Sequence, residues 1–314
     1  MSLNADGILE ARSLVQSMAR VAGGALLTLA MVSSAAAEEA RPLPALRAAA
    51  EKLRPLMRKK TPPEIGDWLA QHPEPGQTFD QYLSSNPNRP SRVRTALYLQ
   101  PIGDFTEAQE PLVKDTAEAM RIFFNLPVKS LEALPDAAIP ERGRRSHPAF
   151  GMKQFHTAYI LNEVLPQRRP QDAVALLGLT ATDLFPEPSW NFVFGEASLS
   201  KRVGVWSLAR YGDAKADYTT VLRRTLKVAL HETGHMFGIQ HCTLHECGMN
   251  GSNSLPETDR GPMPFCSECD LKIWWACGAD PVTRYEALAD FAKRNGLADE
   301  EADWRRRAET LGKK

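Results

Sequence analysis

The stretch HETGHMFGIQHC, at residues 231–242, decides the fold of this 314-residue chain. If it forms a helix, His231 and His235 lie one turn apart on the same face, where a single cation can contact both imidazoles. His241 is too far along the sequence to reach that cation from the same helix. The chain must therefore turn back, and Gly238 is suited to the turn because glycine adopts positive φ at helix ends. Three histidines with a fourth position left open are typical of a catalytic zinc site.

Glu232 follows the first histidine directly and could act as general base on a water at that cation. HExxH alone is a weak signal, because two histidines and a glutamate also occur on ordinary solvated helices. In HExxHxxGxxH the glycine and the third histidine both fall where the geometry needs them. This longer pattern favours the metal site over an amphipathic surface helix.

A second group of metal-ligand residues follows the histidines. Cys242 and Cys247, then Cys266 and Cys269, have the spacing C-x4-C…C-x2-C. Four thiolates in this arrangement predict a closed, structural zinc site. The alternative is a disulfide within either pair, which an oxidising compartment would favour. The fifth cysteine, Cys277, is expected to be a buried, unreactive thiol.

With these cysteines after the histidine motif, the chain resembles the archaemetzincins, in which a metzincin-type helix leads straight into a cysteine cluster. The residues that carry the resemblance are His231, Glu232, His235, Gly238, His241, Cys242, Cys247, Met249, Cys266 and Cys269. The resemblance implies two zinc ions per chain, one catalytic at the histidines and one structural at the cysteines. It also implies that Met249 occupies the turn beneath the active site, for which Met263 is the alternative.

The fold implied by the resemblance is α+β. It is a metzincin-like catalytic domain with a twisted mixed sheet, an active-site helix and a small zinc-stabilised C-terminal subdomain. The local patterns predict strands at residues 96–99 and 173–179, and helices at 107–124, 154–164, 285–295 and 301–311. The predicted organisation is a signal peptide at 1–37, an N-terminal arm at 38–91, a catalytic domain at 92–280 and a helical extension at 281–314.

Residues 190–211, WNFVFGEASLSKRVGVWSLARY, predict two strands joined by a connection that contains glycine. In metzincins an edge strand above the cleft pairs with extended substrate, and this stretch is the candidate by position. The residues expected to line that edge are Phe194, Gly195, Glu196 and Ala197. An ordinary interior hairpin is the alternative.

Composition limits the partners that we expect. The chain has 38 basic and 38 acidic residues, a formal net charge of +0 and a pI of about 7.1. This balance argues against nucleic acid or an anionic membrane surface as the partner. A peptide or protein substrate is expected instead, bound by a monomer.

The N-terminus carries a compartment signal. From Met18, a possible start, one arginine precedes an apolar run at residues 21–32, and Ala35 and Ala37 form an A-x-A cleavage site. The run is too short to span a bilayer. We expect export to the periplasm or the exterior. An Ala-rich N-terminus of a cytoplasmic protein is the alternative.

The predicted function is that of a zinc metallopeptidase. It would hydrolyse peptide bonds through a water on the three-histidine zinc, with Glu232 as general base. A catalytically silent zinc-binding module of the same fold, which recognises peptides or proteins, is the alternative.

Overall fold

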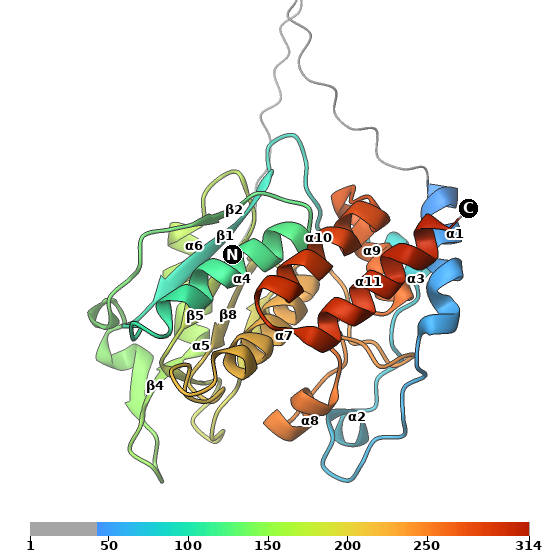
Figure 1. Ribbon diagram of the computed structural model, residues 1–314. Coiled ribbons are helices and arrows are strands. Elements are labelled where there is room, and N and C mark those ends of the chain that lie inside the picture. The colour runs from blue at the N-terminus through green and yellow to red at the C-terminus, as the bar shows by residue number, and fades with distance from the viewer. Residues whose placement is uncertain (1–42, 314) are drawn as a thin grey trace, which may run out of the picture. The chain divides into compact units, whose positions relative to one another are not determined.

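The computed structural model describes residues 43–313 of the chain (Figure 1). The predicted signal peptide at residues 1–37 and the possible start at Met18 lie outside the described residues. Among residues 43–313, no helix is both long enough and apolar enough to cross a membrane.

The central element is a five-stranded mixed sheet with the strand order β2-β1-β5-β8-β7. The first four strands in this order run parallel, and β7 pairs with β8 in the antiparallel direction at the end of the sheet. The strands are β1 (Ala96–Ile102), β2 (Val128–Ser130), β5 (Ala173–Thr180), β7 (Gly195–Ser198) and β8 (Val203–Ser207).

Both faces of this sheet are covered, because its strands are apolar on both sides. In β1, Leu97 and Leu99 belong to the main core, whereas Ala96 and Tyr98 belong to a second cluster on the opposite face. Continuous apolar runs of this kind are typical of buried parallel strands. The predicted strands at 96–99 and 173–179 are confirmed, although β1 runs on through Pro101 to Ile102.

The main core lies between the sheet and two long helices, α4 (Glu110–Phe123) and α7 (Tyr218–Met236). The helix α7 begins at Asp217, whose carboxylate accepts a hydrogen bond from the backbone N–H of Thr220. It carries the HETGH sequence in its last turns. The predicted mixed sheet, active-site helix and α+β class are confirmed.

The opposite face of the sheet is covered by α5 (Thr157–Tyr159), a π-helical turn (Ile160–Val164) and α6 (Leu165–Arg168). A small second sheet flanks them, with strands β3 (Arg144–Ser146), β4 (Lys153–His156) and β6 (Asp183–Phe185). The predicted helix at 154–164 was therefore wrong over its first residues. Gln154 and Phe155 pair with strands on both sides, and these partners lie 9 to 29 residues away in sequence.

The N-terminal arm lies against the C-terminal helices. Its helices are α1 (Leu43–Leu53), α2 (Trp68–Gln71) and α3 (Phe79–Ser84), with a 3₁₀ turn at Arg54–Leu56. Leu46 and Leu53 of α1 are buried in the main core, and α1 contacts α9 (Ser267–Cys277) and α11 (Ala298–Gly312). In Figure 1, α2 lies beside α8 (Leu255–Arg260).

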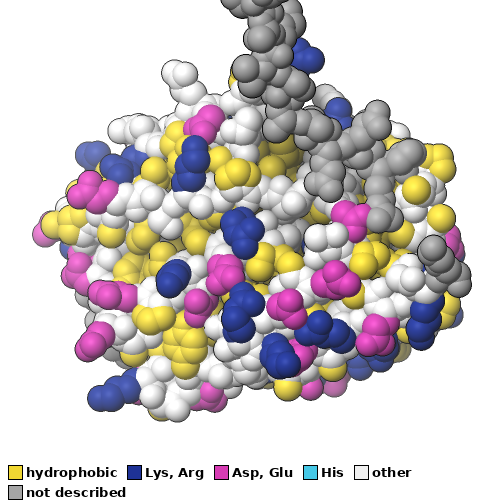
Figure 2. Space-filling model, turned by 45° about the horizontal axis from the view of Figure 1, so that its top comes forward, with side chains coloured by type: hydrophobic (Ala, Val, Ile, Leu, Met, Phe, Trp, Pro, Cys, Tyr) yellow, Lys and Arg dark blue, Asp and Glu magenta, His cyan; other side chains and the backbone are white. Residues whose placement is uncertain are grey.

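The predicted C-terminal helices are present as α10 (Pro281–Arg294) and α11, separated at Gly296. A buried charged network ties them to α9. Asp270 of α9 lies 3.0 Å from the Arg284 guanidinium and 3.2 Å from that of Arg307, and it accepts a hydrogen bond from the Tyr285 hydroxyl. The molecular face in Figure 2 carries interspersed basic and acidic side chains, in keeping with the balanced composition.

Candidate active site

The end of α7 brings the three histidines together. His231 and His235 lie on one face of the helix, and their Nε2 atoms are 2.9 Å apart. The chain then turns at Gly238, which has a φ of +80°, and returns to place His241 beside them. One ring nitrogen from each histidine lies within 4.8 Å of the others. The geometry that the sequence predicts for this stretch is therefore present.

Hydrogen bonds fix the orientation of all three rings. The Nδ1 of His231 lies 2.9 Å from the Gly248 carbonyl, and that of His235 lies 2.7 Å from the Ile239 carbonyl. The Nδ1 of His241 lies 2.9 and 3.0 Å from the two carboxylate oxygens of Glu74. Acceptors on every Nδ1 require a proton there, so each Nε2 keeps its lone pair for a metal.

Electrostatics keep two of these rings neutral. Burial, together with the neighbouring imidazoles, lowers the pKa of His231 well below its usual value. The same two causes lower the pKa of His235 to about 4. Because a metal binds the neutral imidazole, the donor set fits a cation such as zinc.

Glu232 lies beside the histidines, next to the edge strand β7. Burial, with a smaller contribution from the charge of Glu196, raises the pKa of its carboxyl to about 8. Gly195 faces this carboxylate so closely that a Cβ on Gly195 would lie 3.1 Å from Glu232 Oε1. The carboxyl of Glu196 accepts a hydrogen bond from the Thr157 hydroxyl.

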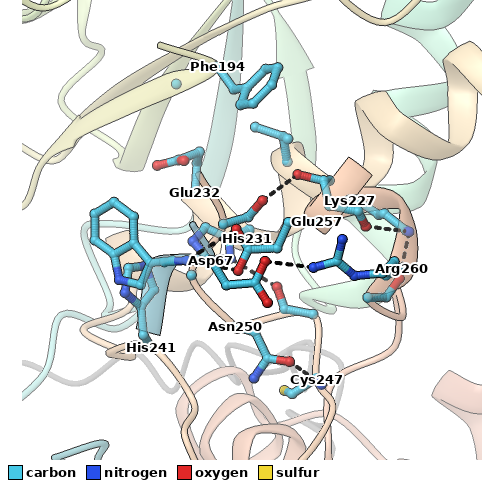
Figure 3. A pocket seen from close by; sticks show the side chains of 18 of the residues that line it. Asp67, Phe194, Lys227, His231, Glu232, His241, Cys247, Asn250, Glu257 and Arg260 are labelled. Carbon is cyan, nitrogen blue, oxygen red and sulfur yellow. Dashed lines mark hydrogen bonds and ion pairs between the residues drawn. The ribbon is translucent and has the colours of Figure 1, made fainter. Parts of the chain in front are cut away.

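A cavity of about 800 Å³ opens next to His231, His235 and His241 (Figure 3). Its walls come from the edge strand, from α7, from the N-terminal arm and from the segment that follows Met249. The residues predicted to line the edge, Phe194, Gly195, Glu196 and Ala197, all border this cavity. The predicted glycine in the connection was wrong: Gly195 and Gly204 lie within β7 and β8, and residues 199–202 join them. Glycine serves there in close packing between strands rather than in a turn.

Met249 packs beneath the two helical histidines. It is fully buried, and its Sδ would lie only 2.5 Å from a Cβ placed on Gly234, which stands between His231 and His235 in α7. Met263 is also buried, but it is not among the atoms nearest to Gly234. The position under the helix thus belongs to Met249 in this structure.

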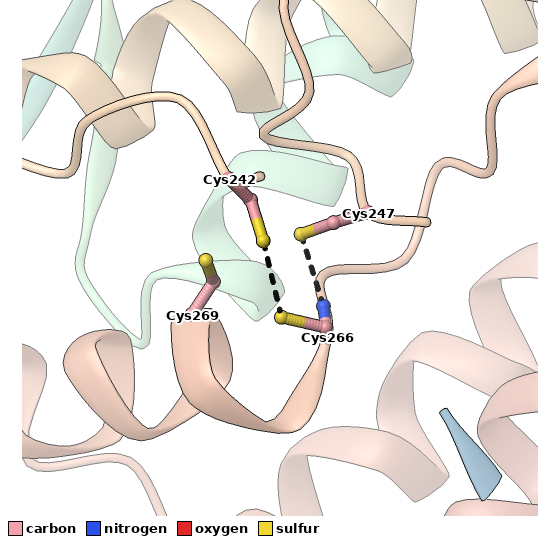
Figure 4. A group of neighbouring side chains, drawn as sticks. All are labelled: Cys242, Cys247, Cys266 and Cys269. Atoms are coloured by element: carbon pink, nitrogen blue, oxygen red, sulfur yellow. Dashed lines mark hydrogen bonds between the residues drawn. The ribbon is translucent and has the colours of Figure 1, made fainter. Parts of the chain in front are cut away.

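The four cysteines predicted to bind metal form a second cluster (Figure 4). Cys242 and Cys247 come from the loop after α7, whereas Cys266 and Cys269 come from the start of α9. Their sulfur atoms lie within 4.8 Å of one another, and Cys242 Sγ is 3.7 Å from Cys266 Sγ. Sulfurs placed tetrahedrally at about 2.3 Å from a zinc would be about 3.8 Å apart. All five cysteines are free.

The four thiols differ in their surroundings, which favour the thiolate at Cys266. By contrast, burial raises the pKa of Cys247, and hydrogen bonds with the other three thiols raise that of Cys269. Hydrogen bonds from the thiols of Cys242, Cys247 and Cys269 lower the pKa of Cys266 well below its usual value. The Cys247 sulfur accepts hydrogen bonds from the backbone N–H groups of Met249 and Cys266, at 3.4 and 3.1 Å. This donor set fits a structural zinc. Cys277 is buried apart from the cluster, and burial raises the pKa of its thiol.

Two residues at the histidine site, Glu74 and Trp68, were not predicted from the sequence; both lie in the N-terminal arm. Trp68 lies edge-on to His241, with ring centroids 5.2 Å apart. The local sequence around them, DWLAQHPEPG, has the proline and glycine content of a loop and no motif spacing. Only the folded chain brings this loop to His241, which follows Glu74 by 167 residues.

Comparisons with known proteins agree with these observations. Residues 170–274 match the model of Peptidase family M54. The chain is 35% identical to archaemetzincin-2 of Pongo abelii over 257 residues, which covers 71% of each chain. It is 31% identical to archaemetzincin-1 of Homo sapiens, which covers 71% of this chain and 51% of that protein. The crystal structure of archaemetzincin from Archaeoglobus fulgidus is 30% identical, with a TM-score of 0.47, and covers 56% of this chain and 99% of that one.

Proposed function

We propose that this chain, which belongs to the archaemetzincin family of zinc metallopeptidases, hydrolyses peptide bonds at the three-histidine site. In this proposal Glu232 is the general base. The observation that carries this proposal is the arrangement of the site itself. The imidazole rings of His231, His235 and His241 converge beside the buried carboxyl group of Glu232, in a cleft bordered by the edge strand β7.

The residues for two metal ions are present. His231, His235 and His241 would hold a catalytic zinc, and the four cysteines would hold a structural one. When bound at the histidines, zinc supplies Lewis acidity toward a water molecule and a peptide carbonyl. Gly248, Ile239 and Glu74 orient the three rings toward that position.

Glu232 carries the proton transfers in this proposal. As general base its carboxylate takes a proton from the attacking water, and it returns that proton to the amine of the leaving peptide. In the metal-free site burial raises the pKa of the carboxyl to about 8, so its ionised form is a stronger base than an exposed glutamate.

The edge strand supplies the peptide-binding surface. The strand β7 ends the sheet order, and an extended substrate would pair with its free edge as an additional strand. A second cavity, of about 630 Å³, shares His235, His241 and Leu199 with the first and is also bordered by Ser200 after β7. A peptide bound at the histidines thus has room in two adjoining cavities, which favours internal cleavage over removal of terminal residues.

Digestion of a peptide library, read by mass spectrometry, tests this function. The wild-type protein should make internal cuts, and Glu232→Ala should keep its zinc but lose at least about 100-fold in rate, because general-base catalysis contributes that much or more. Glu286→Ala, an exposed carboxylate on α10, is the matched control and should cut normally. Full activity in Glu232→Ala would refute the mechanism.

The same digestion separates the alternatives. Stepwise loss of N-terminal residues would indicate an aminopeptidase. If wild type and variants all bind zinc and cut nothing, a silent peptide-recognition module becomes the better interpretation. Export and the monomeric state stay predictions, which cell fractionation and light scattering would check.

A further inference from the structure

The three histidines differ in how their rings are oriented. The acceptors for His231 and His235 are backbone carbonyls, of Gly248 and Ile239, that lie within 17 residues of them in sequence. His241 instead meets a carboxylate from the N-terminal arm, Glu74. His241 also lies beyond the end of α7, so no helix holds its ring. The orientation of the His241 ring therefore depends more strongly on a hydrogen-bond partner than the orientations of the His231 and His235 rings do.

The contact between Glu74 and His241 is well defined. Both carboxylate oxygens of Glu74 lie within 3.0 Å of His241 Nδ1. Both side chains are largely buried: 29% of the Glu74 side chain and 18% of the His241 side chain is exposed. Glu74 Oε1 also accepts a hydrogen bond from the Trp68 indole at 3.1 Å. The same indole ring stands edge-on to His241. Glu74 and Trp68 together thus enclose one side of the imidazole.

The arm is anchored to the catalytic domain on both sides of Glu74. Before it, the backbone N–H of Trp68 donates to the Glu257 carboxylate at 3.0 Å. After it, the Gln77 side chain donates to the Gly238 carbonyl at 3.2 Å and accepts from the backbone N–H of Gln240 at 3.2 Å. The anchors at Gly238 and Gln240 lie in the turn that carries His241. The arm therefore contacts the turn that carries the third histidine directly.

A further pairing holds residues 58–60 of the arm, which border the cavity. Residues 58–60 run antiparallel to residues 244–246, with Lys60 N–H donating to the Leu244 carbonyl at 3.1 Å and Glu246 N–H to the Arg58 carbonyl at 2.9 Å. The Glu246 carboxylate in turn accepts from the backbone N–H of Thr61 at 2.9 Å. Residues 58–61 and Gln77 thus contact the segment 238–246 that contains His241 and Cys242, whereas Asp67 and Trp68 between them contact α8.

We propose that Glu74 is a positioning residue for His241, so that the N-terminal arm completes the catalytic metal site. The proposal rests on the proposed function in taking His241 as a metal ligand. A carboxylate on Nδ1 holds the tautomer that directs Nε2 to the metal and raises the basicity of the ligand. Loss of such a partner costs about 10- to 100-fold in metal affinity.

Zinc affinity at the histidine site tests this role directly. Competition with a chromophoric chelator should show that Glu74→Ala lowers the zinc affinity of one site about 10- to 100-fold. The zinc affinity of the other site should be unchanged. Glu74→Gln, which keeps an acceptor but not the charge, should give an intermediate loss. Since Gln has the same shape, this variant also keeps the test informative if Glu74→Ala folds poorly.

Two controls isolate the contact with His241. Glu64→Ala removes an exposed arm carboxylate that has no histidine contact and should leave both affinities unchanged. Trp68→Phe removes the indole hydrogen bond to Glu74 but keeps an aromatic ring beside His241, and it should retain most of the affinity. Thermal melting of the metal-free proteins should be alike for wild type, Glu74→Gln and Glu64→Ala.

The outcomes separate this proposal from the proposed function. Wild-type zinc affinity in both Glu74 variants would overturn the positioning role, as would an equal loss in Glu64→Ala. His241→Ala serves as the reference: if it leaves both zinc affinities unchanged, the three-histidine metal site is itself wrong. If His241→Ala loses affinity and the Glu74 variants do not, only the role of the arm fails.

Discussion

At the scale of single residues, Gly195 sets the distance between the edge strand and Glu232, the proposed general base. A Cβ at this position would lie 3.1 Å from Glu232 Oε1, from Trp206 Cβ and from the Val205 carbonyl oxygen. Gly195→Ala should therefore displace the carboxylate by a few tenths of an ångström and lower kcat about 10-fold, since a 1 Å misplacement can cost about 100-fold. Steady-state kinetics on a cleaved peptide would measure this.

The neighbouring strand provides the control for this prediction. A Cβ on Gly204 of β8 would meet Ala197 Cβ and the Glu196 carbonyl at 3.6 Å, which is ordinary contact. Gly204→Ala should keep kcat near the wild-type value. Equal kcat values for Gly195→Ala and Gly204→Ala would show that the space between Gly195 and the Glu232 carboxyl group does not affect turnover.

At the scale of secondary-structure elements, α7 depends on a contact with the loop that follows it. Gly234 lies inside the helix, where alanine would ordinarily add about 1 kcal/mol of stability. Here a Cβ would lie 2.5 Å from the Sδ of the fully buried Met249. Overpacking costs about 1–3 kcal/mol, so Gly234→Ala should lower the free energy of unfolding by about 1 kcal/mol in denaturant titrations.

The sign of this effect identifies its cause. In a Met249→Ala background the clash is gone, and Gly234→Ala should then stabilise the protein. Gly312→Ala at the end of α11, where a Cβ would meet nothing within 4 Å, should change stability little. A gain in stability from Gly234→Ala in the wild-type background would contradict the packing argument.

At the scale of the whole molecule, the cysteine cluster belongs to the main core rather than to a separate unit. Cys242, Cys247, Cys266 and Cys269 are all buried there, among side chains from α1, α4 and α7. Structural zinc stabilises small zinc domains by on the order of 10 kcal/mol. In a chain with a large core of its own, Cys242→Ser should cost less than this, a few kcal/mol, and release one zinc.

Cys242→Ser should also lower turnover, because the residue directly follows His241. Cys277→Ser, at a buried cysteine outside the cluster, should keep both zinc ions and most of the activity. Metal analysis, thermal melting and peptide hydrolysis would be compared for the two variants. Unchanged zinc content, melting and turnover in Cys242→Ser would refute the structural site.

Local spacing was enough to predict much of this protein from its sequence. The pattern of His231, His235, Gly238 and His241 follows from helix periodicity and one turn, so it could be read without a structure. The apolar strands at β1 and β5 and the helices α4, α10 and α11 have continuous local patterns. The boundary between β4 and α5 was placed wrongly, because residues 153–156 become a strand only through pairing with β3 and β6.

By itself, then, the sequence determined the α+β class and the family, and it predicted the two candidate ligand sets and the proposed general base, since each depends on residues close together in the chain. The tertiary structure alone decided which groups surround them. The place of Gly195 beside Glu232 and of Met249 under Gly234 comes from packing between separate elements. The contact of Glu74 with His241 joins residues 167 apart. Local sequence patterns do not predict such contacts, because burial and hydrogen bonding over the whole chain bring these groups together.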